Sequence, residues 1–295
     1  MPAPGEPRFA SWLSAPVRML AEQWARLDFA AFQRVPVEEL LRAGFDDPRY
    51  KHSADAVRAC IDRFNAESLW AASEVMAAPS PRARAATYMR LLAVAVWLRR
   101  LRDYFGLSAI LTGLRSGPIK RLHLTHAALP ADAAELEKDL SKTVSEALFF
   151  TRYLRALAAT PPGAAATPYL APHTQLLLLT ESAMDSAFPT NWNLGHAYKG
   201  RALYEVAAPL AELKEGTFTA ERDGDACRPV FAVCGLIEAA LRGHTFYFDE
   251  DAGAARARLL RQSTEAEPDL PPPPLSEPDI GDDEEVGQWE QGEEL

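Results

Sequence analysis

Apolar residues recur at intervals of three and four along most of the chain, which is the spacing of one face of an α-helix. Near the N-terminus, Val17, Leu20 and Trp24 follow this spacing. Asp28 is a candidate N-cap for a second helical piece, and Pro36 is well placed to begin a third. The pattern therefore predicts several short helices in the first part of the chain.

The middle of the chain predicts longer helices. One helix is expected from Ser53 or Asp55 through Phe64, and a separate one over residues 66–78. Residues 82–101 are apolar almost all round, which is typical of a central core helix. A long helix is expected over residues 130–157, followed by a flexible link at residues 160–167. Neither a strand pattern of convincing length nor an internal repeat is present, so the predicted fold class is all-α.

The stretch from Pro168 to Ala211 predicts a helical hairpin. Its first half contains four consecutive leucines, Leu176 to Leu179, which indicate a largely buried helix. The pattern breaks at residues 188–191, and a second helical pattern begins near Trp192. Two helices joined by a turn rich in Pro and Asn form an αα-hairpin, and the pattern alone would make it one more pair in a helical domain.

Composition and charge divide the chain into three parts. Residues 1–15 are rich in Pro, Gly and Ser and are predicted to be a disordered leader. The domain is expected over residues 16–268. Residues 269–295 are predicted to be a disordered, Pro-rich acidic tail, with the run Pro271–Pro274 acting as a spacer or a polyproline helix.

The net charge of −10 is concentrated at the C-terminus. Residues 265–295 contain 12 Asp and Glu and no Lys or Arg, so the rest of the chain has 29 acids and 31 bases and a balance of +2. A domain that is nearly neutral is not expected to bind nucleic acid.

Several other kinds of chemistry lack a sequence signature. The three cysteines, Cys60, Cys227 and Cys234, are too few and too scattered for a disulfide framework or a zinc site. His123 and His126 have a spacing that could suit a metal, but no third ligand is evident, so no metal site is predicted. Phosphate-binding loops, nucleophile elbows and paired carboxylates are not found. The sequence thus does not predict a metabolic enzyme.

The chain has no signal peptide and no segment of the length that spans a membrane. The expected location is the cytoplasm.

Five blocks of the chain follow one another in order and with sensible spacing. They are residues 20–41, Arg63-Phe64-Asn65 with Leu69-Trp70, residues 82–114, residues 117–125 and residues 263–268. Together they resemble the catalytic domain of the Ras-type guanine-nucleotide exchange factors, the RasGEF family. The resemblance covers about residues 17–268.

The resemblance implies a single helical domain with a protruding hairpin, at about residues 168–211, that releases GDP from a Ras-family small GTPase. Such GTPases hold the nucleotide through a phosphate-binding loop and a bound Mg²⁺. In the family the hairpin displaces switch I while a groove beside it holds switch II. No covalent bond changes and no cofactor is needed, so the implied activity is exchange rather than enzymatic conversion.

The resemblance also implies roles for individual residues. Leu178 lies where the family has an apolar residue that excludes Mg²⁺. Ser182 lies where the family usually has an acid directed at the phosphate loop, and Glu181 is beside it. The implied GTPase-binding residues are Ile61, Ala95, Arg102, Leu148, Tyr169, His196 and Lys199.

The chain departs from the family pattern at positions that contact the GTPase. Ser182 cannot supply a negative charge, and adjacent helix residues such as Glu181 point about 100° away. Arg102 and His196 stand where the family has asparagines. An alternative function is therefore a scaffold that has the RasGEF fold and binds a GTPase without exchanging its nucleotide.

The sequence does not identify the GTPase, which belongs to the Ras, Rap or Ral branch. Lipidated GTPases reside on membranes, so transient recruitment to the membrane is expected, although no lipid-binding domain or lipidation motif is visible. The sequence does not settle the role of the acidic tail. A third hypothesis is that the tail folds back over the nearly neutral domain and inhibits it.

Overall fold

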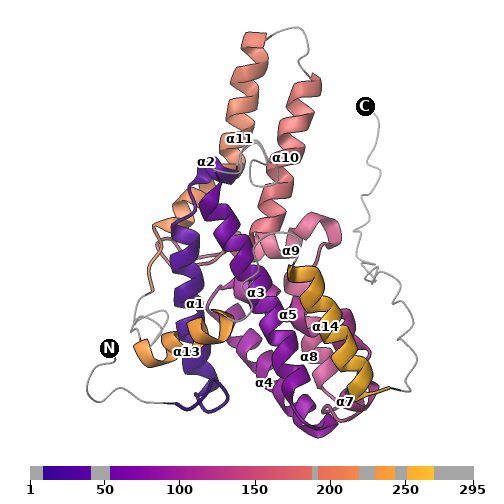
Figure 1. Cartoon of the computed structure of the whole chain (residues 1–295). Helices are drawn as coiled ribbons and strands as arrows, with labels where there is room; N and C mark the ends of the chain where they lie inside the picture. Colours follow the sequence, from indigo (N-terminus) through magenta and orange to yellow (C-terminus); the bar gives the residue numbers. More distant parts are fainter. Residues whose placement is uncertain (1–8, 41–53, 188–191, 219–229, 243–250, 269–295) are drawn as a thin grey trace, which may run out of the picture.

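A computed structural model describes residues 9–40, 54–187, 192–218, 230–242 and 251–268. The described residues form α-helices and no β-strand, as the sequence predicted (Figure 1). The helices are α1 (Val17–Gln33), α2 (Val37–Leu40), α3 (Asp55–Ala77), α4 (Pro81–Arg100), α5 (Tyr104–Leu114), α6 (Gly117–Lys120), α7 (His123–Ala127), α8 (Ala133–Thr143), α9 (Ala147–Ala158), α10 (Leu170–Ala187), α11 (Trp192–Lys214), α13 (Phe231–Arg242) and α14 (Asp251–Ala266).

Helix α4 is the central helix, as predicted. Ser80 caps its N-terminus by accepting a hydrogen bond from the amide of Ala83, and Pro81 occupies its first turn. Tyr88, Leu92 and Leu98 are buried on different sides of the helix. The helices α1, α3, α5, α7 and α8 all contact it.

Several predicted boundaries were wrong. Asp28 is not an N-cap, because α1 continues through it and its side chain is buried. The two helices predicted over residues 53–78 form the single helix α3, in which Glu67 is buried near the predicted break. The long helix predicted over residues 130–157 is interrupted between α8 and α9, where Ser145 accepts a hydrogen bond from the amide of Ala147.

The leader predicted over residues 1–15 extends too far into the domain. Trp12 is buried, and its ring centroid lies 5.0 Å from that of Trp70 on α3. Arg90 on α4 donates hydrogen bonds to the carbonyls of Trp12 and Ala15. The packed domain therefore begins before residue 16.

The C-terminal helix α14 is fastened to the core by a buried ion pair. Nη2 of Arg84 lies 2.9 Å from Oε1 of Glu267, and both side chains are nearly inaccessible to solvent. The same carboxylate accepts hydrogen bonds from the amides of Leu124 and Thr125 and from the Thr125 hydroxyl. These donors hold the pKa of Glu267 below its ordinary value despite the cost of burial.

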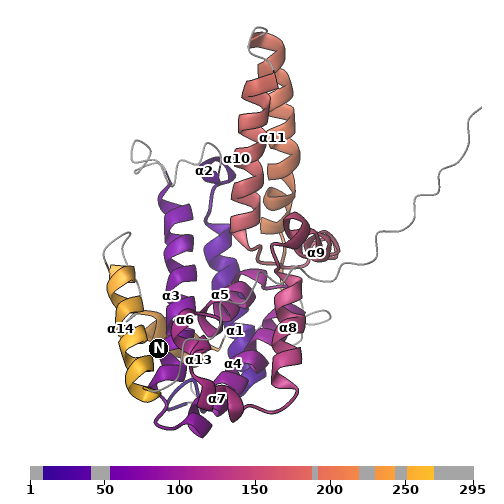
Figure 2. The same ribbon diagram turned by 90° about the vertical axis from the view of Figure 1, so that its right-hand side faces the viewer.

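Helices α10 and α11 form the predicted hairpin, which projects beyond the rest of the domain (Figures 1 and 2). Its base rests in a second apolar cluster, to which α10 contributes Leu170 and Leu177 and α11 contributes Leu210. Phe32 and Phe105 are other members of that cluster. The predicted turn at residues 188–191 lies outside the described residues.

The link into the hairpin is ordered, contrary to the prediction for residues 160–167. Ala164 to Thr167 are buried, and the amide of Tyr104 donates to the carbonyl of Thr167 over 3.0 Å. On the other side, the amide of Ala165 donates to the carbonyl of Thr217 over 3.1 Å. A Cβ on Gly216 would lie 2.5 Å from the carbonyl oxygen of Ala164, so this close approach requires glycine. The hairpin is therefore held at both its entry and its exit.

Candidate functional site

The outer half of the hairpin exposes apolar side chains. On α10, 39% of Leu178 and 52% of Leu179 are exposed, and on α11 53% of Tyr198 is exposed. Leu177, by contrast, is buried against the base. The prediction of a largely buried leucine helix therefore holds only for the side of α10 that faces the domain. Clustered apolar surface of this kind is typical of an interaction site.

Leu178 and Ser182 lie one helical turn apart on α10 and so project from the same face. Helix α10 continues to Ala187, directly before the predicted break at residues 188–191. Ser182 is exposed. The predicted pair is thus presented together on the surface of the hairpin.

Glu181 is turned toward the second helix of the hairpin. Its Oε1 atom lies 3.3 Å from Nζ of Lys199, and about a quarter of each side chain or less is exposed. This ion pair brings together two of the predicted site residues. Its geometry keeps the Glu181 carboxylate on the side of α11, away from the face of Leu178 and Ser182.

An apolar pocket lies at the base of the hairpin between α3, α5 and α10. Its volume is about 240 Å³, and its lining includes Ile61, Phe64, Tyr169 and Cys60. The rings of Phe64 and Tyr169 stack with centroids 5.6 Å apart. Burial, reinforced by Asp28, raises the pKa of the Cys60 thiol to about 12, so it lines the pocket as a neutral group. Two predicted groove residues, Ile61 and Tyr169, therefore share one pocket.

A buried polar pair connects this pocket to α9. The hydroxyl of Tyr153 lies 2.8 Å from Nε2 of His173 and donates to the carbonyl of Tyr169 over 3.2 Å. Burial lowers the pKa of His173 to about 4, so the imidazole is neutral at neutral pH. The pair fixes the first turn of α10 against α9.

Not every predicted binding residue belongs to this surface. Ala95 is wholly buried in the core, so in this structure it offers no surface to a partner. Arg102 has a φ of 62°, and its Nε donates to the carbonyl of Ala165 over 2.9 Å, which supports the link into the hairpin. The side chains of Leu148 on α9 and His196 on α11 lie outside the described part of the structure.

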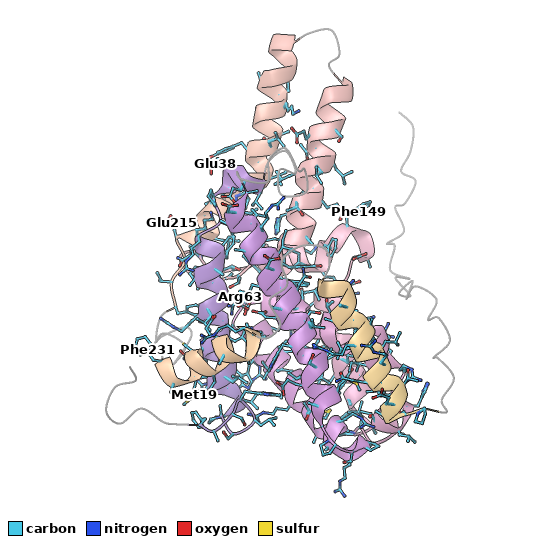
Figure 3. The ribbon with its side chains drawn as sticks, viewed as in Figure 1. Met19, Glu38, Arg63, Phe149, Glu215 and Phe231 are labelled. Atoms are coloured by element: carbon cyan, nitrogen blue, oxygen red, sulfur yellow. The ribbon has the colours of Figure 1, made fainter. Side chains whose placement is uncertain are left out.

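Phe149 was not among the residues predicted from the sequence. This residue has a φ of 54°, which is uncommon for a bulky side chain, and 79% of it is exposed. Figure 3 shows it on α9 beside the base of α10. A strained backbone that presents an aromatic ring to solvent is frequent at functional sites. Nothing in the local sequence predicts a positive φ here.

A cation site is not supported by the described residues. They contain no group of three or more His, Cys, Asp or Glu that could hold a metal ion. Nε2 of His126 lies 3.1 Å from the carbonyl oxygen of Ile119. Among the described helices, none combines the length and the apolar character needed to cross a bilayer.

Comparison with known proteins identifies the domain. The family model of the RasGEF domain matches residues 19–196, which is more than half of the chain. The chain belongs to the RasGEF family. The match extends from α1 into the first turn of α11, and so includes the pocket and the exposed face of Leu178 and Ser182.

Curated relatives of this RasGEF domain are named as exchange factors. Ras guanine nucleotide exchange factor A of Dictyostelium discoideum is 30% identical over 164 residues, which cover 55% of this chain and 27% of that protein. Ras guanine nucleotide exchange factor J of the same organism is 30% identical over 153 residues, which cover 51% of this chain and 18% of that protein. The Ras-specific guanine nucleotide-releasing factor RalGPS1 of Gallus gallus is 30% identical over 178 residues, which cover 59% of this chain and 29% of that protein. The chain spans less than a third of the length of each.

Proposed function

We propose that this RasGEF domain is a guanine-nucleotide exchange factor for a Ras-family small GTPase and that the hairpin of α10 and α11 carries the activity. The observation that most supports it is the exposed face of Leu178 and Ser182 on a hairpin whose base is rigidly held. A wedge that displaces switch I must resist the reaction force of the displaced segment. The buried link at residues 164–167 supplies that resistance.

The apolar pocket would bind switch II. Ile61, Phe64 and Tyr169 offer a neutral, preformed site for an apolar side chain of the partner. Phe149, on α9 beside the base of α10, would add an exposed aromatic anchor, of the kind that often dominates the energy of an interface. Binding at the pocket would position the hairpin over the nucleotide.

Leu178 would act by placing an apolar group where Mg²⁺ is bound. A cation is poorly solvated beside a methyl group, so Mg²⁺ would leave the site. Without Mg²⁺, the GTPase binds the phosphates of the nucleotide more weakly. By thermodynamic linkage, a factor that weakens nucleotide binding is itself displaced when nucleotide returns. Exchange then proceeds without any covalent step.

A second candidate is a GTPase-binding scaffold, and one observation favours it. Ser182 carries no charge, and the neighbouring Glu181 is paired with Lys199. At positions 181 and 182, therefore, the hairpin offers no free carboxylate to the face of Leu178. The scaffold would bind the GTPase through the same pocket but leave the nucleotide in place.

Release of a fluorescent GDP analogue from purified Ras, Rap and Ral proteins distinguishes the two. We expect acceleration for at least one of them. Ser182→Glu should raise that rate about tenfold, because a carboxylate makes a charge-assisted hydrogen bond to the phosphate-loop hydroxyl. Ala183→Glu is the matched control, since it adds the same charge to the next exposed position but on another face of α10. Binding without acceleration, for both the natural chain and Ser182→Glu, would favour the scaffold.

A further inference from the structure

A second and larger cavity is lined mainly by residues of α5 and α8. Figure 2 labels both helices in the lower part of the domain, below the hairpin. Its volume is about 620 Å³. We call it the cationic groove, because Arg115, Lys120, Lys138 and Lys142 line it against only two acids. Three of the six lysines of the chain are therefore gathered around one cavity.

The charges of the cationic groove are poorly neutralised. Lys120, Lys138 and Lys142 are exposed, and none of them forms an ion pair or a side-chain hydrogen bond within the part of the chain that the structure describes. Arg115 has a weak partner in Glu137, with Nε and Oε1 3.8 Å apart. Glu137 is also engaged by the hydroxyl of Tyr88 at 2.6 Å. The groove thus offers several cations to an acidic ligand.

The other end of the cationic groove is aromatic and adjoins the proposed GTPase site. Phe150 and Tyr169 line that end. Tyr169 also lines the apolar pocket. A ligand that fills the groove as far as Tyr169 would therefore obstruct the site proposed for switch II.

The acidic segment at residues 269–295 has the matching composition. It contains many Asp and Glu residues and no Lys or Arg, and it carries Trp289 and Ile280 among the acids. The segment therefore contains an aromatic residue that could pack at the aromatic end of the groove and carboxylates that could pair with the cations at its other end. The segment also starts close to the groove. The hydroxyl of Ser263 donates to the carbonyl of Pro118 over 2.6 Å, and Nη2 of Arg121 lies 3.4 Å from the carbonyl oxygen of Glu267. These contacts place the end of α14 beside α6, the helix that ends at Lys120.

The length of the segment is sufficient. The part of α8 that lines the groove, from Ala134 to Lys142, rises about 12 Å. Even with the dimensions of a Gly-rich coil, a chain of this length averages roughly 30 Å from end to end. Each exposed ion pair is weak, but a tethered ligand benefits from a high effective concentration.

We infer that the cationic groove between α5 and α8 is a docking site for the acidic segment at residues 269–295 of the same chain. Its occupation competes with the GTPase at Tyr169, a consequence that rests on the proposed exchange activity. Docking itself does not depend on that activity. The exposed arginines of α14, namely Arg256, Arg258 and Arg261, form the rival surface for the same segment.

Zero-length carbodiimide cross-linking of the full chain tests the docking directly. At low salt, we expect intramolecular links from carboxylates of residues 269–295 to Lys120, Lys138 and Lys142, and their loss at high salt because the contact is electrostatic. Lys199 and Lys214 serve as internal references. Links that are absent from the groove lysines, or equally frequent at the reference lysines, would overturn the inference whether or not the protein exchanges nucleotide.

Exchange assays on full-chain variants test the competition. Replacing Asp282, Asp283, Glu284 and Glu285 by Asn or Gln should raise the rate of GDP release about threefold or more at low salt. Lys138→Glu with Lys142→Glu should produce a similar gain, and combining the two sets should add little. The α14 pair Arg256→Glu and Arg258→Glu is the matched control. If this pair reproduces the gain and the groove pair does not, the docking site lies on α14 and the inference is wrong.

Discussion

Leu178→Glu is expected to lower the acceleration of GDP release by at least roughly 100-fold, which corresponds to about 3 kcal/mol at a central contact. The substitution places a carboxylate where the proposed mechanism requires an apolar group. A carboxylate would attract Mg²⁺ instead of excluding it. Because 39% of Leu178 is exposed in the free protein, the change should have little effect on folding.

Leu176→Glu is a matched control on the same helix. Leu176 is 40% exposed, almost the same fraction as Leu178. Side chains two residues apart on an α-helix point about 160° away from each other, so Leu176 projects from the other side of α10. The rate of GDP release should change less than about threefold. Equal losses for both variants would mean that general damage to the hairpin, rather than the position of Leu178, causes the effect.

Arg63→Ala is expected to destabilise the fold by about 3–5 kcal/mol, because it leaves buried carboxylates without a cation. Nε of Arg63 lies 2.7 Å from Oδ1 of Asp28 and 3.0 Å from Oε1 of Glu67. Its Nη1 is 3.0 Å from Oε1 of Glu238 on α13. Figure 3 shows Arg63 at the centre of the domain, on α3. Urea denaturation followed by circular dichroism measures the loss. Arg201→Ala, which removes an exposed ion pair with Glu205, should cost under about 0.5 kcal/mol.

The stability that the Arg63→Ala variant loses should depend on pH. Burial, and then the charge of Asp28, holds the pKa values of Glu67 and Asp103 well above their ordinary values of 4.5 and 3.8. A raised pKa in the folded state favours the protonated carboxyl. The stability that these two protonated carboxyls contribute is fully present at a pH below their ordinary pKa values. It is lost as the pH rises through their raised pKa values in the folded state. The variant should therefore be least destabilised near pH 4 and progressively more so toward neutral pH. A loss that does not change with pH would argue against an electrostatic role for Arg63.

The fold was largely predictable because its signals are local. The spacing of apolar residues along α1, α4 and the hairpin is set by burial of one face, and it survives in any sequence that packs that face. The errors arose where tertiary contacts override local preference. Asp28 resembles an N-cap in sequence, yet α1 runs through it because Arg63 from another helix pairs with it. Trp12 lies in a stretch rich in Pro and Ser, yet the rings of α3 bury it.

The site was predictable only in part. Ile61 and Tyr169 were assigned by resemblance and do line one pocket. Ala95 was assigned in the same way, but the packing of α4 leaves it no surface. The ion pair of Glu181 and Lys199 depends on the register of the two hairpin helices, which a sequence does not reveal. The positive φ of Phe149 likewise depends on how α9 meets the rest of the domain.

The most direct test of exchange activity compares the affinity of the full chain for the GDP-bound and the nucleotide-free forms of the same GTPase. By linkage, an exchange protein that weakens nucleotide binding by a given ratio must bind the nucleotide-free GTPase more tightly than the GDP-bound GTPase by the same ratio. We predict a preference of at least about 100-fold for the nucleotide-free form, strongly reduced by Leu178→Glu and retained by Leu176→Glu. Equal affinity for the two forms would contradict exchange and would identify the protein as a GTPase-binding scaffold.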